Sequence, residues 1–90
     1  MFHLIKKNKG LFTKELFKGE ISQGKRNGFG LQLFPNGCYF IGFWKDDRAH
    51  GFGRLCFKDG TYYEGMYYKN MIQNGKMKYY NGASFEGAFD

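Results

Sequence analysis

The same three-residue motif, an aromatic residue, any residue and then glycine, recurs four times along this chain of 90 residues. The four copies are Phe17-Lys18-Gly19, Phe40-Ile41-Gly42, Tyr63-Glu64-Gly65 and Phe85-Glu86-Gly87. Their glycines lie 23, 23 and 22 residues apart. Self-similarity at a period of about 20–50 residues indicates a repeat architecture, in which each unit buries its apolar face only against its neighbours. We therefore divide the chain into residues 1–16, units at about 17–39, 40–62 and 63–84, and a partial unit at 85–90.

Each unit also carries the signal of a β-hairpin. A turn dipeptide follows at a constant offset, as Asn36-Gly37, Asp59-Gly60 and Asn81-Gly82. Two loop forms are compatible with it, a two-residue type I′ turn and a three-residue loop that ends on a left-handed glycine. Pro35 favours the three-residue loop, because proline suits the first central position of a type I turn and cannot donate a hydrogen bond from a paired strand.

This loop determines which residues face each other across each hairpin. In the first hairpin it pairs Gln32 with Phe40, Gly30 with Gly42 and Gly28 with Trp44. The equivalent pairs in the later hairpins are Leu55–Tyr63, Gly53–Gly65, Gly51–Tyr67, Met77–Phe85, Gly75–Gly87 and Gln73–Phe89. The same register sets Arg54 opposite Glu64 and Lys76 opposite Glu86, although these charges play no part in deriving it. We predict an all-β fold, an elongated twisted ribbon of tandem antiparallel β-hairpins.

The repeated glycines and rings have a structural interpretation. Facing glycines leave a bare patch of backbone on which a ring of an adjacent hairpin can pack. We expect the rings to be Trp44, Tyr63, Tyr67, Phe85 and Phe89, each burying on the order of 150–250 Å². The residues to which we assign this structural role are Gly28, Gly30, Gly42, Trp44, Gly51, Gly53, Tyr63, Gly65, Tyr67, Gly75, Phe85 and Gly87.

The segment from Phe40 to Gly60 resembles the MORN repeat, whose pattern is Tyr-x-Gly-x-Trp, a short polar loop, Gly-Tyr-Gly, a strand and Asn/Asp-Gly. The resemblance covers about residues 17–90 and implies a rod-like array of hairpins. The third unit departs from it, with Gln73 in place of the first glycine and one loop residue fewer. Gln32 stands where the other units have Leu55 and Met77. Residues 1–16 fit no unit and form either a basic N-terminal arm or a degenerate capping strand.

The face opposite the repeated glycines is apolar in the first hairpin, mixed in the second and polar in the third. Contiguous exposed apolar patches of more than a few hundred Å² usually mark interaction sites. The first hairpin therefore supplies our candidate partner-binding residues, Phe29, Leu31, Leu33, Tyr39, Ile41 and Phe43. The alternative is that residues 1–16 fold back over this patch, with Leu4, Ile5, Leu11 and Phe12 covering it.

The net charge of +6 is concentrated near the N-terminus. Residues 1–27 contain seven basic and two acidic groups, whereas residues 28–90 contain seven basic and six acidic groups. We assign Lys6, Lys7, Lys9 and Lys14 as candidate contacts to an acidic partner or to anionic lipid. Nucleic acid is disfavoured as a partner, because the aromatic residues are not interleaved with this basic run.

The sequence favours no catalytic or metal site. Cys38 and Cys56 form no CxxC pair, and only His3 and His50 accompany them, so we expect free thiols in a reducing compartment and no zinc. No serine or cysteine has a recognisable base partner, and we predict no cofactor and no small-molecule substrate. No apolar run reaches about 18 residues, which excludes a transmembrane helix. The apolar start precedes its lysines, the reverse of the order in a secretory signal.

These observations predict a non-enzymatic scaffold that binds other proteins. The resemblance implies a small subunit of a large cytoskeletal or ciliary and axonemal assembly, in the cytoplasm. Residues 85–90 would leave an open edge strand that another strand could join. The alternatives are a frayed terminus or a boundary inside a longer protein, and the sequence favours none of the three. The alternative function is a peripheral membrane module that binds anionic phospholipid through its basic arm.

Overall fold

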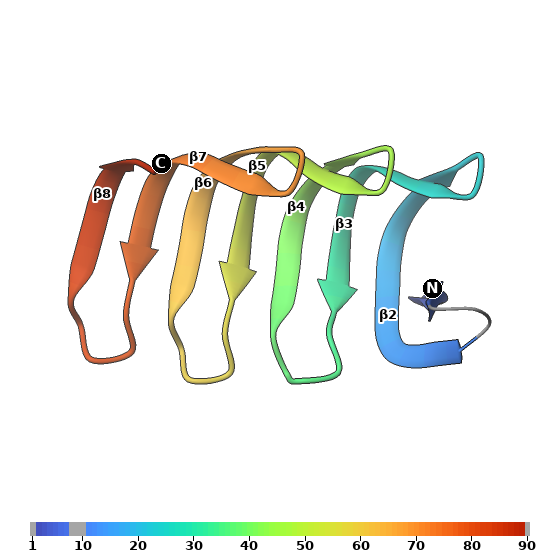
Figure 1. Ribbon diagram of the computed structural model, residues 1–90, viewed down its shortest axis with the longest axis horizontal. Coiled ribbons are helices and arrows are strands. Elements are labelled where there is room, and N and C mark those ends of the chain that lie inside the picture. Colours follow the sequence, from blue (N-terminus) through green and yellow to red (C-terminus); the bar gives the residue numbers. More distant parts are fainter. Residues whose placement is uncertain (1, 8–10, 90) are drawn as a thin grey trace.

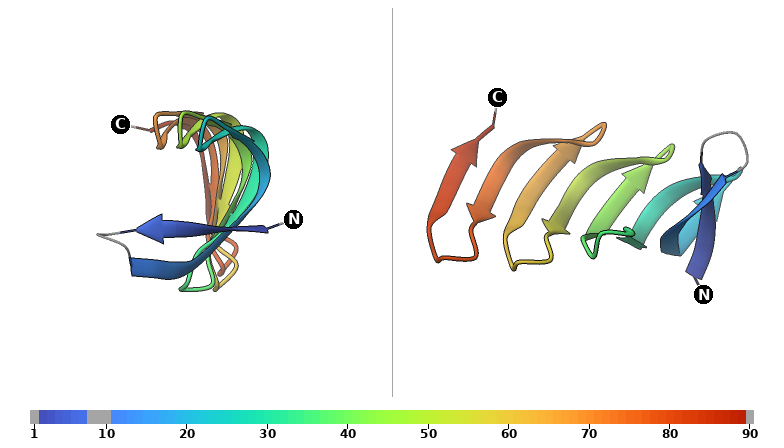
Figure 2. Two further views of the ribbon diagram at one scale, coloured as in Figure 1. Left: turned by 90° about the vertical axis from the view of Figure 1, so that its right-hand side faces the viewer. Right: turned by 60° about the horizontal axis from the view of Figure 1, so that its bottom comes forward.

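The computed structural model of the protein describes residues 2–7 and 11–89, with backbone alone for 2–7 and 11–15. These residues form the strands β1 (Phe2–Lys7), β2 (Leu11–Ser22), β3 (Lys25–Leu33), β4 (Tyr39–Lys45), β5 (Arg48–Cys56), β6 (Tyr62–Tyr68), β7 (Met71–Lys78) and β8 (Ser84–Ala88). They make one eight-stranded antiparallel sheet whose strand order follows the chain (Figure 1). The molecule measures 39 × 24 × 23 Å, and viewed from the β2 end its strands curve in the same sense (Figure 2). The predicted all-β, elongated ribbon of hairpins is confirmed.

The hairpins β3–β4, β5–β6 and β7–β8 have the predicted three-residue loops. In the first, the Phe34 N–H donates to the Cys38 carbonyl at 2.9 Å, and the Gly37 N–H donates to the Phe34 carbonyl at 3.2 Å. Phe57–Thr61 and Tyr79–Ala83 repeat this pattern. The register that follows is also as predicted, with Gly30 opposite Gly42, Gly53 opposite Gly65 and Gly75 opposite Gly87.

The other connections, which join β2 to β3, β4 to β5 and β6 to β7, are two-residue turns. Both central residues have positive φ in each, at Gln23 and Gly24, Asp46 and Asp47, and Lys69 and Asn70. Positive φ at both positions defines the type I′ turn, whose twist matches that of the flanking strands. Only the first turn has glycine at its second position, so the Asn/Asp-Gly signal did not predict these turns.

A bulge explains why the third unit lacks the first glycine. Between the pairs Gly42–Gly53 and Trp44–Ala49, β4 contributes the single residue Phe43 while β5 contributes residues 50–52. Gly51 has φ of 107° inside this bulge, a conformation that disfavours residues with a Cβ. The corresponding bulge of β7 is shorter by one residue and contains no positive φ at Gln73. The lost residue and the lost glycine are therefore one structural change.

One face of the sheet holds a core of edge-to-face aromatic rings. The Trp44 ring centroid lies 5.6 Å from that of Phe17 and 5.3 Å from that of Phe40, whose centroid lies 5.0 Å from that of Tyr67. These four rings are buried, and such contacts add to the stabilisation that their burial provides.

The rings that cover the glycine pairs are Phe17 and Phe40. A Cβ placed on Gly30 would overlap the Phe17 ring, and one on Gly53 would overlap the Phe40 ring. Each ring thus packs on a glycine of its own unit, which corrects the expectation that the glycines are covered by Trp44, Tyr63, Tyr67, Phe85 and Phe89. Trp44 and Tyr67 are buried as expected, but the expected burial of Phe85 is wrong, since its side chain is 46% exposed. No described strand lies beyond β8 to enclose it.

Candidate interaction surfaces

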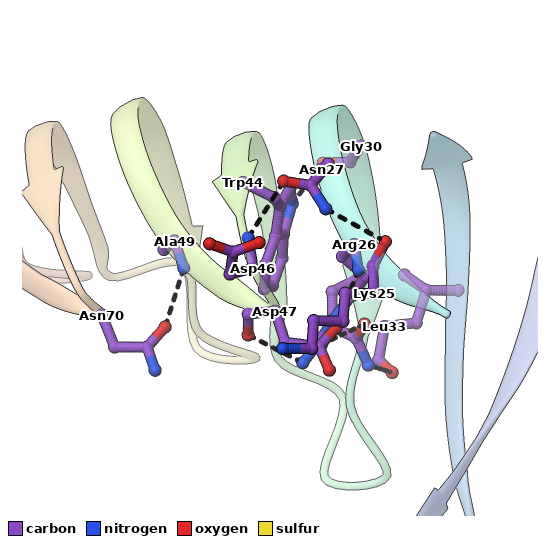
Figure 3. Close-up of polar contacts among 11 residues, drawn as sticks. Lys25, Arg26, Asn27, Gly30, Leu33, Trp44, Asp46, Asp47, Ala49 and Asn70 are labelled. Carbon is purple, nitrogen blue, oxygen red and sulfur yellow. Dashed lines mark hydrogen bonds and ion pairs between the residues drawn. The ribbon is translucent and has the colours of Figure 1, made fainter. Parts of the chain in front are cut away.

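Each later type I′ turn is fastened to the preceding unit. Asp47, in the β4–β5 turn, accepts a 2.8 Å hydrogen bond on Oδ1 from the Arg26 N–H, and its own N–H donates to the Arg26 carbonyl at 3.0 Å. Asn70, in the β6–β7 turn, repeats this on Ala49, at 2.8 and 2.9 Å (Figure 3). These Asx residues join units that the sheet ladder alone would link more weakly, and the corresponding position of the first turn is Gly24.

Arg26 also explains the exceptional Gln32. The Arg26 Nη1 donates to Gln32 Oε1 at 2.9 Å, and the guanidinium lies 4.4 Å from the Trp44 ring centroid. Gln32 is 0% exposed, so this bond satisfies an acceptor that water cannot reach. One period later the two positions are Ala49 and Leu55, an apolar pair. The Arg26–Gln32 pair therefore satisfies its buried polar atom, whereas the Ala49–Leu55 pair has no polar side-chain atom to satisfy.

Arg26 controls the ionisation of Asp47 as well. Partial burial raises the pKa of Asp47, but the hydrogen bonds from the Arg26 backbone and guanidinium and the charges of Arg26 and Lys25 hold this pKa below its ordinary value. The Arg26 Nε lies 3.0 Å from Asp47 Oδ1. Asp47 thus remains an anion that anchors the turn at neutral pH.

The opposite face of β3 and β4, the reverse face, presents the six candidate partner-binding residues. Phe29 is 49% exposed and Phe43 is 46% exposed, and their ring centroids lie 5.3 Å apart. Leu31 pairs with Ile41, and Leu33 pairs with Tyr39. Phe52, 53% exposed on β5, and Met66 on β6 extend this surface. Side chains so exposed form an apolar surface that the described side chains do not cover.

The reverse face becomes polar along the array. Arg54 Nη2 and Glu64 Oε2 form an ion pair at 2.7 Å, as the register predicted. Lys76 faces Glu86 in the next hairpin, and both are exposed. Cys56 is buried and Cys38 is half-buried, and both are free cysteines as predicted.

The N-terminal residues extend the sheet at its edge. The backbone of β1 pairs with β2, where Phe2 faces Lys18 and Lys7 faces Leu11. Figure 2 shows β1 and the start of β2 turned across the end of the ribbon. Of the candidate lysines, Lys9 lies outside the described residues. The side chains of Lys6, Lys7 and Lys14, and those of Leu4, Ile5, Leu11 and Phe12, are likewise outside the description.

A basic depression of about 410 Å³ lies beside the type I′ turns. Its lining consists of Lys25, Lys45, Asp46, Arg48, His50, Tyr68 and Lys69. The sequence did not indicate it, because residues 28–90 are almost neutral and these cations are distributed over three successive units. The 23-residue offset between Lys25 and Arg48 was the signal available. A smaller apolar hollow of about 140 Å³ lies on the core face, beside Phe40, Trp44 and Tyr67.

The described side chains contain no group of three or more His, Cys, Asp or Glu residues that could hold a metal ion. Within the same part of the chain, no helix is long and apolar enough to cross a membrane.

Comparison with known families decides the assignment. A model of the MORN repeat matches residues 17–39 and 40–62. The chain belongs to the MORN-repeat family. Its first two units are the matched ones, and the third carries the shortened bulge at Gln73. MORN repeats are generally non-catalytic modules that bind proteins or membranes.

Proposed function

We propose that this protein is a non-enzymatic scaffold subunit that binds another protein through the reverse face of β3 and β4. The observation that carries the proposal is the group of half-exposed apolar side chains on that face, with Phe29 and Phe43 packed edge to face. Removal of such an apolar surface from water by a partner lowers the free energy of the complex. The resemblance to MORN proteins supports the further proposal that this partner belongs to a cytoplasmic cytoskeletal or axonemal assembly.

The test is detergent extraction of cells that produce the tagged full chain. The wild type is expected to remain with the insoluble cytoskeletal fraction, whereas Phe29→Ser/Phe43→Ser is expected to appear mainly in the soluble fraction. The matched control is Tyr79→Ser/Tyr80→Ser, which removes two exposed aromatic residues from the β7–β8 loop. Thermal unfolding of all three proteins checks that they are folded. Complete release of the wild type would contradict the cytoskeletal assignment.

The second candidate is a peripheral membrane module, supported by the net charge of +5 over residues 1–27. Each basic residue near an anionic surface contributes about 1 kcal/mol to membrane binding. Vesicles containing phosphatidylserine would then carry the wild type in a flotation gradient at moderate salt, and Lys6→Gln/Lys7→Gln/Lys9→Gln/Lys14→Gln would abolish uptake. The scaffold proposal expects no uptake of the wild type.

A further inference from the structure

The basic depression collects positive charge without matching negative charge. Lys25, Lys45, Arg48 and Lys69 line it, and Asp46 is its only acidic residue among the described side chains. Asp47, the neighbouring acid, is already bonded to Arg26. Lys45 and Arg48 are exposed and form no ion pair within the described part of the chain. The hollow therefore presents a positive potential that an anionic group would neutralise.

The depression is continuous with the apolar reverse face. Side chains alternate along β4, so Lys45 follows Tyr39, Ile41 and Phe43 on the same side. Lys45 pairs with Arg48 on β5, and a Cβ at Gly51 would lie 3.3 Å from Phe43 Cβ. Apolar and basic surfaces thus meet at the turn end of β4 and β5.

The shape and side chains of the hollow favour a peptide. Its volume lies within the range of about 300–1,000 Å³ that is usual for sites that bind compact ligands. The cations surround a hollow that also contains the Tyr68 and His50 rings, whose centroids lie 5.1 Å apart. The hollow is concave, so a flat bilayer matches it less well than an extended chain, which can place carboxylates inside and its apolar residues on the adjoining face.

We propose that the depression binds the carboxylates of an acidic peptide segment, whose neighbouring apolar residues lie against the reverse face. The inference deepens the proposed function. Only the placement of the apolar residues on the reverse face rests on that function. The partner is thus expected to carry glutamate or aspartate residues next to an apolar run.

The test uses the full chain and a fluorescein-labelled peptide of eight glutamates, with binding followed by fluorescence anisotropy. The substitution Lys45→Gln/Arg48→Gln is expected to raise the Kd about tenfold, since it removes two cations from the hollow. The matched control Lys76→Gln/Lys78→Gln removes the same charge from exposed positions on β7 and is expected to change the Kd less than twofold. Equal weakening by both would mean that only the overall net charge attracts the peptide, and would overturn the proposal.

Three further arms separate the alternatives. A peptide of eight glutamines is expected not to bind, and equal affinity for it would contradict recognition of carboxylates. Phe29→Ser/Phe43→Ser is expected to retain binding of the glutamate peptide, so loss of cytoskeletal retention with intact peptide binding would concern the apolar face alone. The wild type could instead bind phosphatidylserine vesicles but not the glutamate peptide, with Lys45→Gln/Arg48→Gln abolishing the vesicle binding. That result would overturn the peptide proposal and assign the depression to a membrane surface.

Discussion

At the scale of single residues, the two complete inter-unit contacts of the array differ in a correlated way. Arg26, Gln32 and Asp47 form the first contact, and Ala49, Leu55 and Asn70 form the second one period later. The charged Asp47 occurs in the contact that contains Arg26, and the buried amide of Gln32 accepts a hydrogen bond from the Arg26 guanidinium. Each set satisfies its own polar atoms, so mixing members of the two sets should be more harmful than exchanging a whole set.

The substitution Arg26→Ala is expected to lower the free energy of unfolding by about 2–4 kcal/mol, because it leaves the buried Gln32 oxygen without a donor and removes bonds to Asp47. The triple variant Arg26→Ala/Gln32→Leu/Asp47→Asn reproduces the second contact and is expected to recover at least about 1 kcal/mol of this loss. Urea denaturation measures both. A triple variant less stable than Arg26→Ala would contradict the correlation.

Tyr67 predicts a loss of stability at alkaline pH. Burial raises its pKa from the ordinary value of 10.0 to about 12, and its hydroxyl donates to the Tyr63 carbonyl at 2.8 Å. Because the folded pKa exceeds the unfolded one, the contribution is complete below about pH 10 and decreases as the pH rises toward 12. We expect a loss of about 1 kcal/mol at pH 11 from this group. Urea denaturation between pH 8 and 11 measures how the free energy of unfolding declines. The decline should be shallower for Tyr67→Phe than for the wild type, and the same as the wild type for the exposed Tyr80→Phe.

At the scale of strands and turns, the sequence predicted the hairpins that contain an Asn/Asp-Gly dipeptide and their register. Pro35 and the constant spacing were sufficient, since a register error of one residue would move every ring to the other face. The type I′ turns at Asp46-Asp47 and Lys69-Asn70 could not be predicted in the same way. Their positive φ values are maintained by hydrogen bonds to Arg26 and Ala49, which only the folded array brings within reach.

The glycine of β5 that faces Gly65 supports a third prediction. Gly53→Ala is expected to destabilise the protein by about 1–3 kcal/mol, because the added methyl group would overlap the Phe40 ring. Combining it with Phe40→Leu should cost less than the sum of the two single changes, since the smaller side chain leaves space. Lys58→Ala, at an exposed position of the Phe57–Thr61 loop, is the control and should change stability by less than about 0.5 kcal/mol. Additivity of the first pair in thermal unfolding would argue against the overlap.

At the scale of the whole molecule, the described residues form one sheet with no second layer behind it, and each unit is stabilised by its neighbours. The sequence correctly predicted this architecture. It was wrong about the rings that cover the glycines, which are Phe17 and Phe40, and about the burial of Phe85 on the last strand. The basic depression escaped prediction for a related reason. Lys25, Arg48 and Lys69 lie in successive units and become neighbours only in the folded array. A net charge summed along the sequence does not reveal such a cluster.

This arrangement predicts graded amide hydrogen exchange. Amides of β4, which carries the buried Phe40 and Trp44, and of the adjacent β5 should exchange slowest. Amides of β7 should exchange faster, because its partner β8 has every side chain exposed. Hydrogen exchange followed by mass spectrometry of peptides 39–56 and 71–89 measures the difference. Equal protection of both peptides would show that the sheet opens as one cooperative unit.

The Asx fastening of the turns also bears on how such a chain can change in length. The stretch 40–62 contains both Asp47, which attaches to the unit before, and the backbone amide and carbonyl of Ala49, which receive Asn70 of the next unit. Duplicating that stretch would add two strands and keep the joints to Arg26 and from Asn70, whereas deleting it would bring Asn70 against Arg26. The new joint between the two copies would set Asp47 against Ala49, a mixed contact, so growth by gene duplication is expected to require an exchange such as Asp47→Asn in the second copy. With that exchange, the length of the array can change in steps of a single period.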